Sequence, residues 1–225
     1  MSRRGVVALW ALVVAAHPAA GQTPPAPQRF RVSAGIAAQG SYPLGNRDTL
    51  LRRNAPGPAT TLAFFTTESR LESAPGFDAR VSYGFTRRIA IEVAASYLTP
   101  LLAVGVTLDP EHQSPARIEE TISQYAVDVS GVVQLPFLNS PHVRPYAFGG
   151  AGYLRQLHEA RLLLETGATG HAGAGVSYWI SGRPDTRRGM GVRGEARYVR
   201  RWRGVDFDDA PRGYLSVSAL GFIGF

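Results

Sequence analysis

Charged side chains recur at every second position in several apolar segments, and they are the residues of this chain best suited to chemistry. In a β-strand, alternate side chains point to opposite faces, so these charges share a face with one another and not with their apolar neighbours. Charges on an enclosed face must pair to offset their desolvation. We therefore expect a structural network of the seven residues Asp78, Arg80, Glu92, Asp128, Arg193, Glu195 and Arg197.

Two polar clusters outside those segments raise the possibility of hydrolysis. His158-Glu159 and Asp206-Phe-Asp-Asp209 fall in predicted connections, and paired Asp and His side chains can activate water, as at the barrel rim of omptin-type surface proteases. Their spacing differs from that of omptins. His171 and Ser177 share a strand face, but the chain has no GxSxG, P-loop or HExxH motif. The chain is therefore expected not to be an enzyme and to use no cofactor or metal, with a rim hydrolase as a minor alternative.

The composition narrows the class of protein. The chain has 225 residues, no cysteine and a net charge of +7 that is carried entirely by arginine. The lack of cysteine excludes a disulfide framework, a thiol nucleophile and a cysteine zinc site. The arginines are scattered as singles and pairs, which argues against a nucleic-acid-binding surface.

The first residues have the layout of a secretory signal. A positive start is followed by the apolar run Val6–Ala16 and by small residues at Ala19-Ala20-Gly21. We expect a signal peptide at residues 1–21, a proline-rich lead-in at 22–28 and one exported domain at 29–225. No later run of eighteen apolar residues is present.

The exported part alternates between apolar and polar residues in eight segments, which predicts eight strands. They are Phe30–Ala38, Phe77–Phe85, Ile89–Tyr97, Gln124–Leu135, Arg144–Tyr153, His171–Ile180, Gly191–Trp202 and Gly213–Phe225. Long connections at Gly40–Gly76 and Thr99–Glu120 alternate with short ones at 86–88, 136–142 and 181–189. Thr60–Thr67 is either a wall strand or the raised extension of a hairpin, and Leu101–Leu108 extends a strand beyond the bilayer. If Thr60–Thr67 and one more strand join the wall, the count becomes ten.

These features predict an all-β, antiparallel, up-and-down transmembrane β-barrel. The segments RPYAFGGAGY and GVRGEARYV and the terminal Phe225 with Ile223 two residues before it resemble the outer-membrane-protein β-barrel domain superfamily, of the small OmpA/OmpX type. The resemblance implies a monomer in the outer membrane of a Gram-negative cell. It also implies that Ile223 and Phe225 form a C-terminal signal for the barrel-assembly machinery.

The expected function is structural or interaction-directed, acting through the external loops on envelope stability, adhesion or binding. A small passive, porin-like channel is the alternative, although eight strands leave little open lumen. Membrane lipid and lipopolysaccharide are the expected partners. We expect Arg201, Arg203 and Arg212 in the outer connections to contact lipopolysaccharide phosphates, because guanidinium forks match phosphate oxygens.

Overall fold

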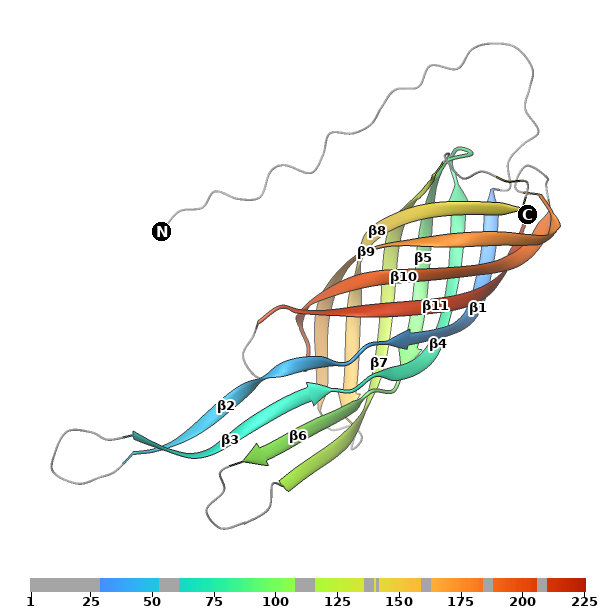
Figure 1. The fold of residues 1–225 in the computed structure, drawn as a ribbon. Coiled ribbons are helices and arrows are strands. Elements are labelled where there is room, and N and C mark those ends of the chain that lie inside the picture. The colour runs from blue at the N-terminus through green and yellow to red at the C-terminus, as the bar shows by residue number, and fades with distance from the viewer. Residues whose placement is uncertain are drawn as a thin grey trace, which may run out of the picture.

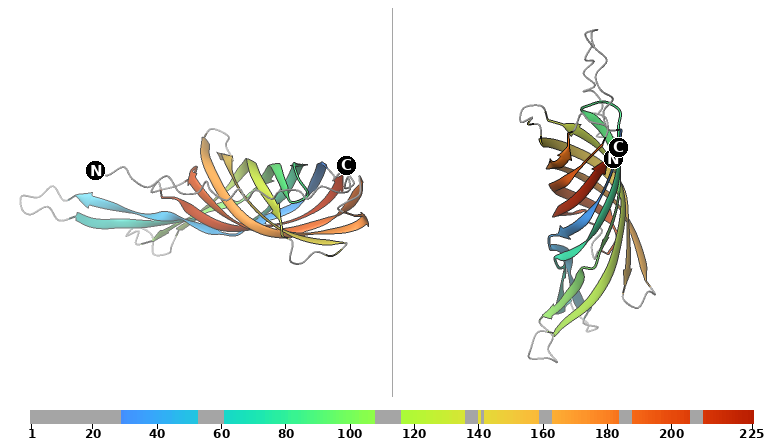
Figure 2. Two further views of the ribbon diagram at one scale, coloured as in Figure 1. Left: turned by 90° about the horizontal axis from the view of Figure 1, so that it is seen from above. Right: turned by 90° about the vertical axis from the view of Figure 1, so that its right-hand side faces the viewer.

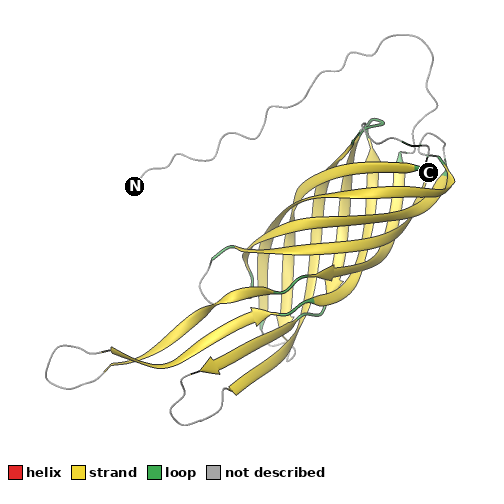
Figure 3. Cartoon of the chain, in the orientation of Figure 1, coloured by secondary structure: helices red, strands yellow, loops and turns green. Residues whose placement is uncertain are grey.

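The protein is a closed β-barrel with a sheet that projects from one end (Figure 1). The structure is a computed structural model that describes residues 29–52, 61–107, 116–135, 140, 142–158, 163–183, 188–205 and 210–225. Figure 3 shows strands and loops and no helix in these ranges. Accordingly, the described residues contain no helix long and apolar enough to cross a membrane. The expected signal peptide and lead-in lie outside the described residues.

Eight of the eleven strands in the described residues form the wall, each antiparallel to its neighbours. Around the barrel they follow the order of the chain, and the last strand pairs with the first. The wall strands are β1 (Phe30–Gln39), β4 (Ala74–Gly84), β5 (Ile89–Leu98), β7 (Ala116–Gln134), β8 (Val143–His158), β9 (Leu164–Gly182), β10 (Gly189–Arg203) and β11 (Arg212–Gly224). The predicted eight-stranded up-and-down barrel is therefore confirmed.

The closure between β1 and β11 joins the two ends of the described chain. Val32 lies opposite Ile223, and Ile36 lies opposite Ala219. The backbone N–H groups of Arg29 and Phe30 donate to the Phe225 carbonyl oxygen over 3.0 and 3.3 Å. The wall strands thus form an unbroken ring of pairings and leave no open edge.

The remaining strands form an arm with the first part of β7. They are β2 (Tyr42–Arg52), β3 (Thr61–Leu71) and β6 (Leu101–Thr107), and the sheet order is β2-β3-β6-β7. Figure 2 shows from two further sides that the arm projects beyond one end of the barrel. The expectation that Gly40–Gly76 is a long loop is wrong, because β2 and β3 are paired strands. Within the predicted connection Thr99–Glu120, the expected strand Leu101–Leu108 is present as β6 over Leu101–Thr107, and β7 begins at Ala116. Residues 61–67 of the predicted segment Thr60–Thr67 belong to β3 in the arm, so they extend a hairpin and add no wall strand.

Three short interruptions separate the arm from the wall. They fall at Gly40-Ser41, Glu72-Ser73 and Thr99-Pro100, between β1 and β2, β3 and β4, and β5 and β6. β7 has no interruption and runs for 19 residues from the arm through the wall. Backbone hydrogen bonds continue across this level, such as Glu72 N–H to the Leu101 carbonyl at 2.8 Å.

The wall is apolar outside and polar inside. The outward faces of the wall strands carry many exposed Val, Ile, Leu and aromatic side chains, whose exposed fraction ranges from 39 % for Ile91 to 68 % for Phe77. Inward side chains include serines, glutamines, carboxylates and arginines that are buried. A soluble protein does not expose so continuous an apolar surface, whereas a barrel in a bilayer requires one.

Candidate functional site

The centre of the barrel holds a cluster of buried ion pairs built from β4, β5 and β10. Arg80 contacts Asp78 at 2.6 Å, Glu92 at 3.1 Å and also Glu195. Arg193 contacts Glu92 at 2.6 Å and Glu195 at 2.8 Å. Two guanidiniums therefore share three carboxylates, and all five side chains are nearly inaccessible to solvent. Because each group forms ion pairs with more than one neighbour or is also hydrogen-bonded, these contacts offset the desolvation of its charge.

Hydroxyl groups complete the bonding of this central cluster. The Tyr146 hydroxyl donates to Glu195 Oε2 at 2.9 Å and accepts from Arg193 Nε at 3.0 Å. Ser82 donates to Glu92, and Ser218 donates to Glu195. Alternation alone does not decide which of Tyr146 and Tyr153 faces the lumen, because the two lie on opposite faces of β8. The structure turns Tyr146 inward and Tyr153 outward.

A second group of polar side chains adjoins the central cluster. Arg197 lies 3.5 Å from Asp128 and 3.9 Å from Asp78, so it connects the two groups. Thr169 donates to Asp128 at 3.1 Å. All seven charged residues assigned to the inner face by the sequence pattern thus have their side chains in one ion-paired system across the lumen.

The side chains of Ser130, His171 and Asp128 follow one another in space as in a nucleophilic triad. The sequence pattern did not indicate this arrangement. Ser130 Oγ is 2.7 Å from His171 Nε2, but His171 Nδ1 is 3.8 Å from Asp128 Oδ1, beyond hydrogen-bonding distance. All three side chains are buried. The cavity beside His171 and Asp128 measures about 20 Å³, which holds about one water molecule. The arrangement therefore has no room for an acyl substrate.

Amide side chains form the next layer toward the arm. Gln124 donates to Gln39, and Gln156 donates to Gln124, each at 2.9 Å. Arg201 donates to Gln156 at 3.1 Å and to the Val205 carbonyl at 2.6 Å. Arg201 is buried, and its guanidinium points into the barrel. The prediction that it contacts lipopolysaccharide is therefore wrong. Arg203 is exposed, and Arg212 donates to the Leu44 carbonyl at 2.6 Å.

An apolar plug closes the barrel at the arm end. Its buried members come from the arm, from β7 and from the segment after β10, and Val104 and Tyr214 pack against them. They are Tyr42, Leu44, Leu71, Leu102, Ile122 and Val205. Tyr42 and Tyr214 stack with ring centroids 4.8 Å apart. The plug and the ion pairs together fill much of the interior, as is usual for eight strands.

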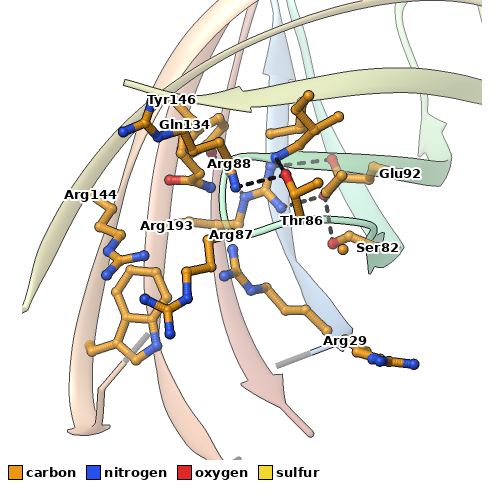
Figure 4. A pocket seen from close by; sticks show the side chains of 16 residues that line it. Arg29, Ser82, Thr86, Arg87, Arg88, Glu92, Gln134, Arg144, Tyr146 and Arg193 are labelled. Carbon is orange, nitrogen blue, oxygen red and sulfur yellow. Dashed lines mark hydrogen bonds and ion pairs between the residues drawn. The ribbon is translucent and has the colours of Figure 1, made fainter. Parts of the chain in front are cut away.

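A basin opens at the opposite end, where the turns are short (Figure 4). Its volume is about 70 Å³, and sixteen residues line it. Six of them are arginines and one is a carboxylate: Arg29, Arg31, Arg87, Arg88, Arg144, Arg193 and Glu92. Arginine pairs are visible in the sequence. Arginines from distant segments meet in the basin only because the barrel closes, so their spacing in the sequence does not predict the basin.

The rim near the arm holds His158, one of the residues proposed for hydrolysis. His158 Nδ1 lies 2.9 Å from Glu120 Oε2, and Nε2 lies 3.9 Å from Glu165. Glu159 and the segment 206–209 lie outside the described residues. Among the residues that are described, no group of three His, Cys, Asp or Glu side chains is arranged to hold a metal ion.

Ile223 and Phe225 lie at the end of β11 with their side chains outward. Ile223 is 52 % exposed and Phe225 is 56 % exposed. The Phe225 N–H donates to the Phe30 carbonyl at 2.8 Å. The backbone of Phe225 thus contributes to closure, while its ring belongs to the outer surface beside the short turns.

The wall, its apolar outer surface and its charged interior define a small eight-stranded barrel of the transmembrane type. No protein-family model and no curated protein matches the chain. Among solved structures, the chain is similar to outer membrane protein OprG from Pseudomonas aeruginosa, with a TM-score of 0.49 and 12% identity over 88% of this chain and 95% of that one.

Two further structures show comparable similarity. Neisserial surface protein A has a TM-score of 0.49 and 15% identity, over 87% of this chain and 96% of that one. Ail, the attachment invasion locus protein of Yersinia pestis, has a TM-score of 0.44 and 12% identity, over 87% of this chain and 97% of that one. That Ail structure is a complex with the heparin analogue sucrose octasulfate. The fold class of the present chain rests on its own strand pairing.

Proposed function

We propose that this chain is an integral outer-membrane protein whose closed barrel anchors an external arm that binds other surfaces. The observation that carries this proposal is the inverted polarity of the wall, with exposed apolar side chains outside and ion pairs inside. Such a wall is stable only where its outer surface meets lipid. The expected signal peptide supports export, and membrane lipid, lipopolysaccharide and the barrel-assembly machinery are the proposed partners of a monomer.

The arm is the part suited to interaction. It continues the sheet beyond the apolar surface of the wall, and charged side chains lie on it, such as Arg117, which contacts Glu119 at 2.8 Å and Glu72 at 3.4 Å. These groups are at least partly exposed, so their pairing contributes little to stability. Exposed charge on a rigid sheet instead favours recognition of a charged or hydrogen-bonding partner.

Cell fractionation combined with a gel of boiled and unboiled samples tests the membrane assignment. A membrane barrel remains folded in detergent and changes its mobility only after boiling. We expect the protein in the outer-membrane fraction with such a shift. Recovery in the soluble fraction without a shift would contradict the proposal.

Trimming the arm separates anchoring from binding. Asn46 and Glu68 are paired across β2 and β3, so residues 47–67 can be replaced by an Asn-Gly turn with the plug residues retained. We expect the trimmed chain to keep its heat-dependent mobility shift and its effect on detergent resistance of cells. Adhesion to immobilised glycans and matrix proteins should fall to the level of cells that lack the protein. Unchanged adhesion would exclude the arm as the binding element.

A small passive channel is the second candidate function. The observation that favours it is the basin at the turn end, which reaches inward to Glu92 and Arg193. The ion pairs and the plug lie between this basin and the arm end, so conduction requires them to rearrange.

We propose a non-catalytic role in place of rim hydrolysis, because the spacing of the candidate residues differs from that of omptins. Substitution of His158 and Asp208 by Ala should leave any hydrolysis detected with wild-type cells unchanged. A loss of hydrolysis in both variants would restore the enzymatic alternative.

A further inference from the structure

The basin at the turn end has a strong excess of positive charge among the residues that line it. Glu92, its one carboxylate, is already bonded to Arg80 and Arg193. The negative charge of Glu92 is therefore already paired with the guanidinium groups of the central cluster. Arg29, Arg31 and Arg88 gain no carboxylate partner from the lining of the basin.

Arg31 is held in place but incompletely bonded. Its guanidinium carbon lies 5.0 Å from the ring centroid of Trp179 and 4.8 Å from that of Phe222. These rings form a T-shaped pair with centroids 5.0 Å apart. The stacking fixes the guanidinium plane, so little conformational entropy is lost when it binds a ligand.

Among the described residues that line the basin, the buried donors Arg31 Nε and Trp179 Nε1 have no hydrogen-bond acceptor. One buried acceptor of the lining, Gln134 Oε1, has no donor. Trp179 is fully buried. Buried N–H groups are normally satisfied, and an unsatisfied one costs about 1–3 kcal/mol. Both N–H groups only donate, so the missing partner is an acceptor.

Arg193, which reaches the basin from the central cluster, and Arg201, which lies near the arm, differ in this respect. Arg193 donates to Glu92, Glu195 and Tyr146, and Arg201 donates to Gln156 and to the Val205 carbonyl. Buried donors without an acceptor also occur elsewhere, such as Gln39 Nε2 in the amide layer, but in the basin they lie beside several arginines.

We propose that the basin binds a phosphate oxyanion, either as free phosphate or as the headgroup of an anionic phospholipid. Several donors converge on it from β1, β9 and the turn before β5, which suits a group with three or more acceptor oxygens. Arginine forks also match phosphate oxygens in geometry. This site lies at the end of the barrel opposite the arm, and it goes beyond the binding role proposed for the arm.

Isothermal titration calorimetry with inorganic phosphate tests the site on the folded full chain. A phosphate-free detergent such as dodecyl maltoside is required, with ionic strength held constant by chloride. The variants are Arg31→Gln and the double variant Arg29→Gln/Arg88→Gln, whose two residues are exposed at the rim. Arg155→Gln is the matched control, because Arg155 is exposed on β8 and does not line the basin.

We expect wild type and the control to bind one phosphate per chain, and both basin variants to bind at least tenfold more weakly. If Arg31→Gln fails to fold on the gel assay, the double variant carries the comparison. Native mass spectrometry from nanodiscs of phosphatidylglycerol or phosphatidylcholine distinguishes the source. Retention of phosphatidylglycerol by wild type and control, without binding of free phosphate, would identify a lipid headgroup. Equal binding by all variants, or binding of neither ligand, would overturn the proposal.

Discussion

Arg80 is the residue on which most of the central ion pairs depend. It contacts Asp78, Glu92 and Glu195, whereas Arg193 contacts two of these carboxylates. Removal of one partner from a buried charge cluster costs more than the pair itself contributes, because the remaining charges stay desolvated.

Arg80→Gln should therefore destabilise the barrel by about 3–5 kcal/mol. Urea unfolding from detergent or lipid vesicles measures this loss. Arg70→Gln on β3 is the control, because Arg70 is exposed and such substitutions change stability by about 0.5 kcal/mol or less. Equal stability of the two variants would show that the central charges are not a structural network.

A substitution at Phe225 tests whether this residue serves as a signal for assembly in the cell or as a contact that stabilises the folded barrel. Its ring is on the outer surface, and its closing hydrogen bonds are made by the backbone. Phe225→Ala should lower the yield of folded protein in cells severalfold while the purified chain refolds normally in detergent. Leu215→Ala removes an outward side chain from the same strand and should preserve the yield. A similar loss of yield in both variants would argue for general surface apolarity.

At the level of elements, closure of the barrel requires close approach between β1 and β11. A Cβ atom at Gly35 would overlap the carbonyl oxygen of Ala219 and the Cα of Leu220, whereas a Cβ at Gly221 would meet no atom within 4 Å. Backbone atoms cannot move aside as a flexible side chain can.

Gly35→Ala should consequently destabilise the barrel by about 1–3 kcal/mol. Gly221→Ala, on the strand that pairs with β1, should be nearly neutral. Urea unfolding of the two variants in the same lipid provides the comparison. If Gly35→Ala were also neutral, the closure would be looser than the pairing of β1 with β11 indicates.

The sequence predicts the wall better than the arm for a physical reason. Where one face meets lipid, every second residue must be apolar, and this periodicity is visible in segments such as Phe77–Phe85. The arm lies beyond that requirement. Pro43, Gly45 and Asn46 are typical of a loop, although they lie in β2, which pairs with β3. Pro56 and Pro58 lie outside the described residues.

The candidate site is predictable in part for related reasons. Strand parity assigns Asp78 and Arg80 to the inner face, where the structure also has them. Which charges meet depends on the register of strands distant in sequence, as with Glu92 on β5 and Arg193 on β10. The inward direction of Tyr146 depends likewise on the register of β8.

For the whole molecule, the arrangement of the interior bears on conduction. The ion pairs of Arg80 and Arg193, the amide layer and the apolar plug follow one another along the lumen. Planar-bilayer recordings should therefore show no conductance steps under conditions in which a large porin conducts. Regular steps that disappear on Arg31→Gln or change size on Arg193→Gln would instead support the small channel.

The three interruptions between the arm and the wall have a mechanical consequence. Gly40-Ser41, Glu72-Ser73 and Thr99-Pro100 interrupt the chain between three pairs of strands, whereas β7 passes from the arm to the wall unbroken. A pull on the arm would load β7 along its length, because this strand joins the arm to the wall without a break. Since β7 pairs with β5 and β8 down to the short turns, the tension would be distributed over many backbone hydrogen bonds. The arm is thus joined to the wall by one unbroken strand, β7, and by three strand pairs that are interrupted at the junction.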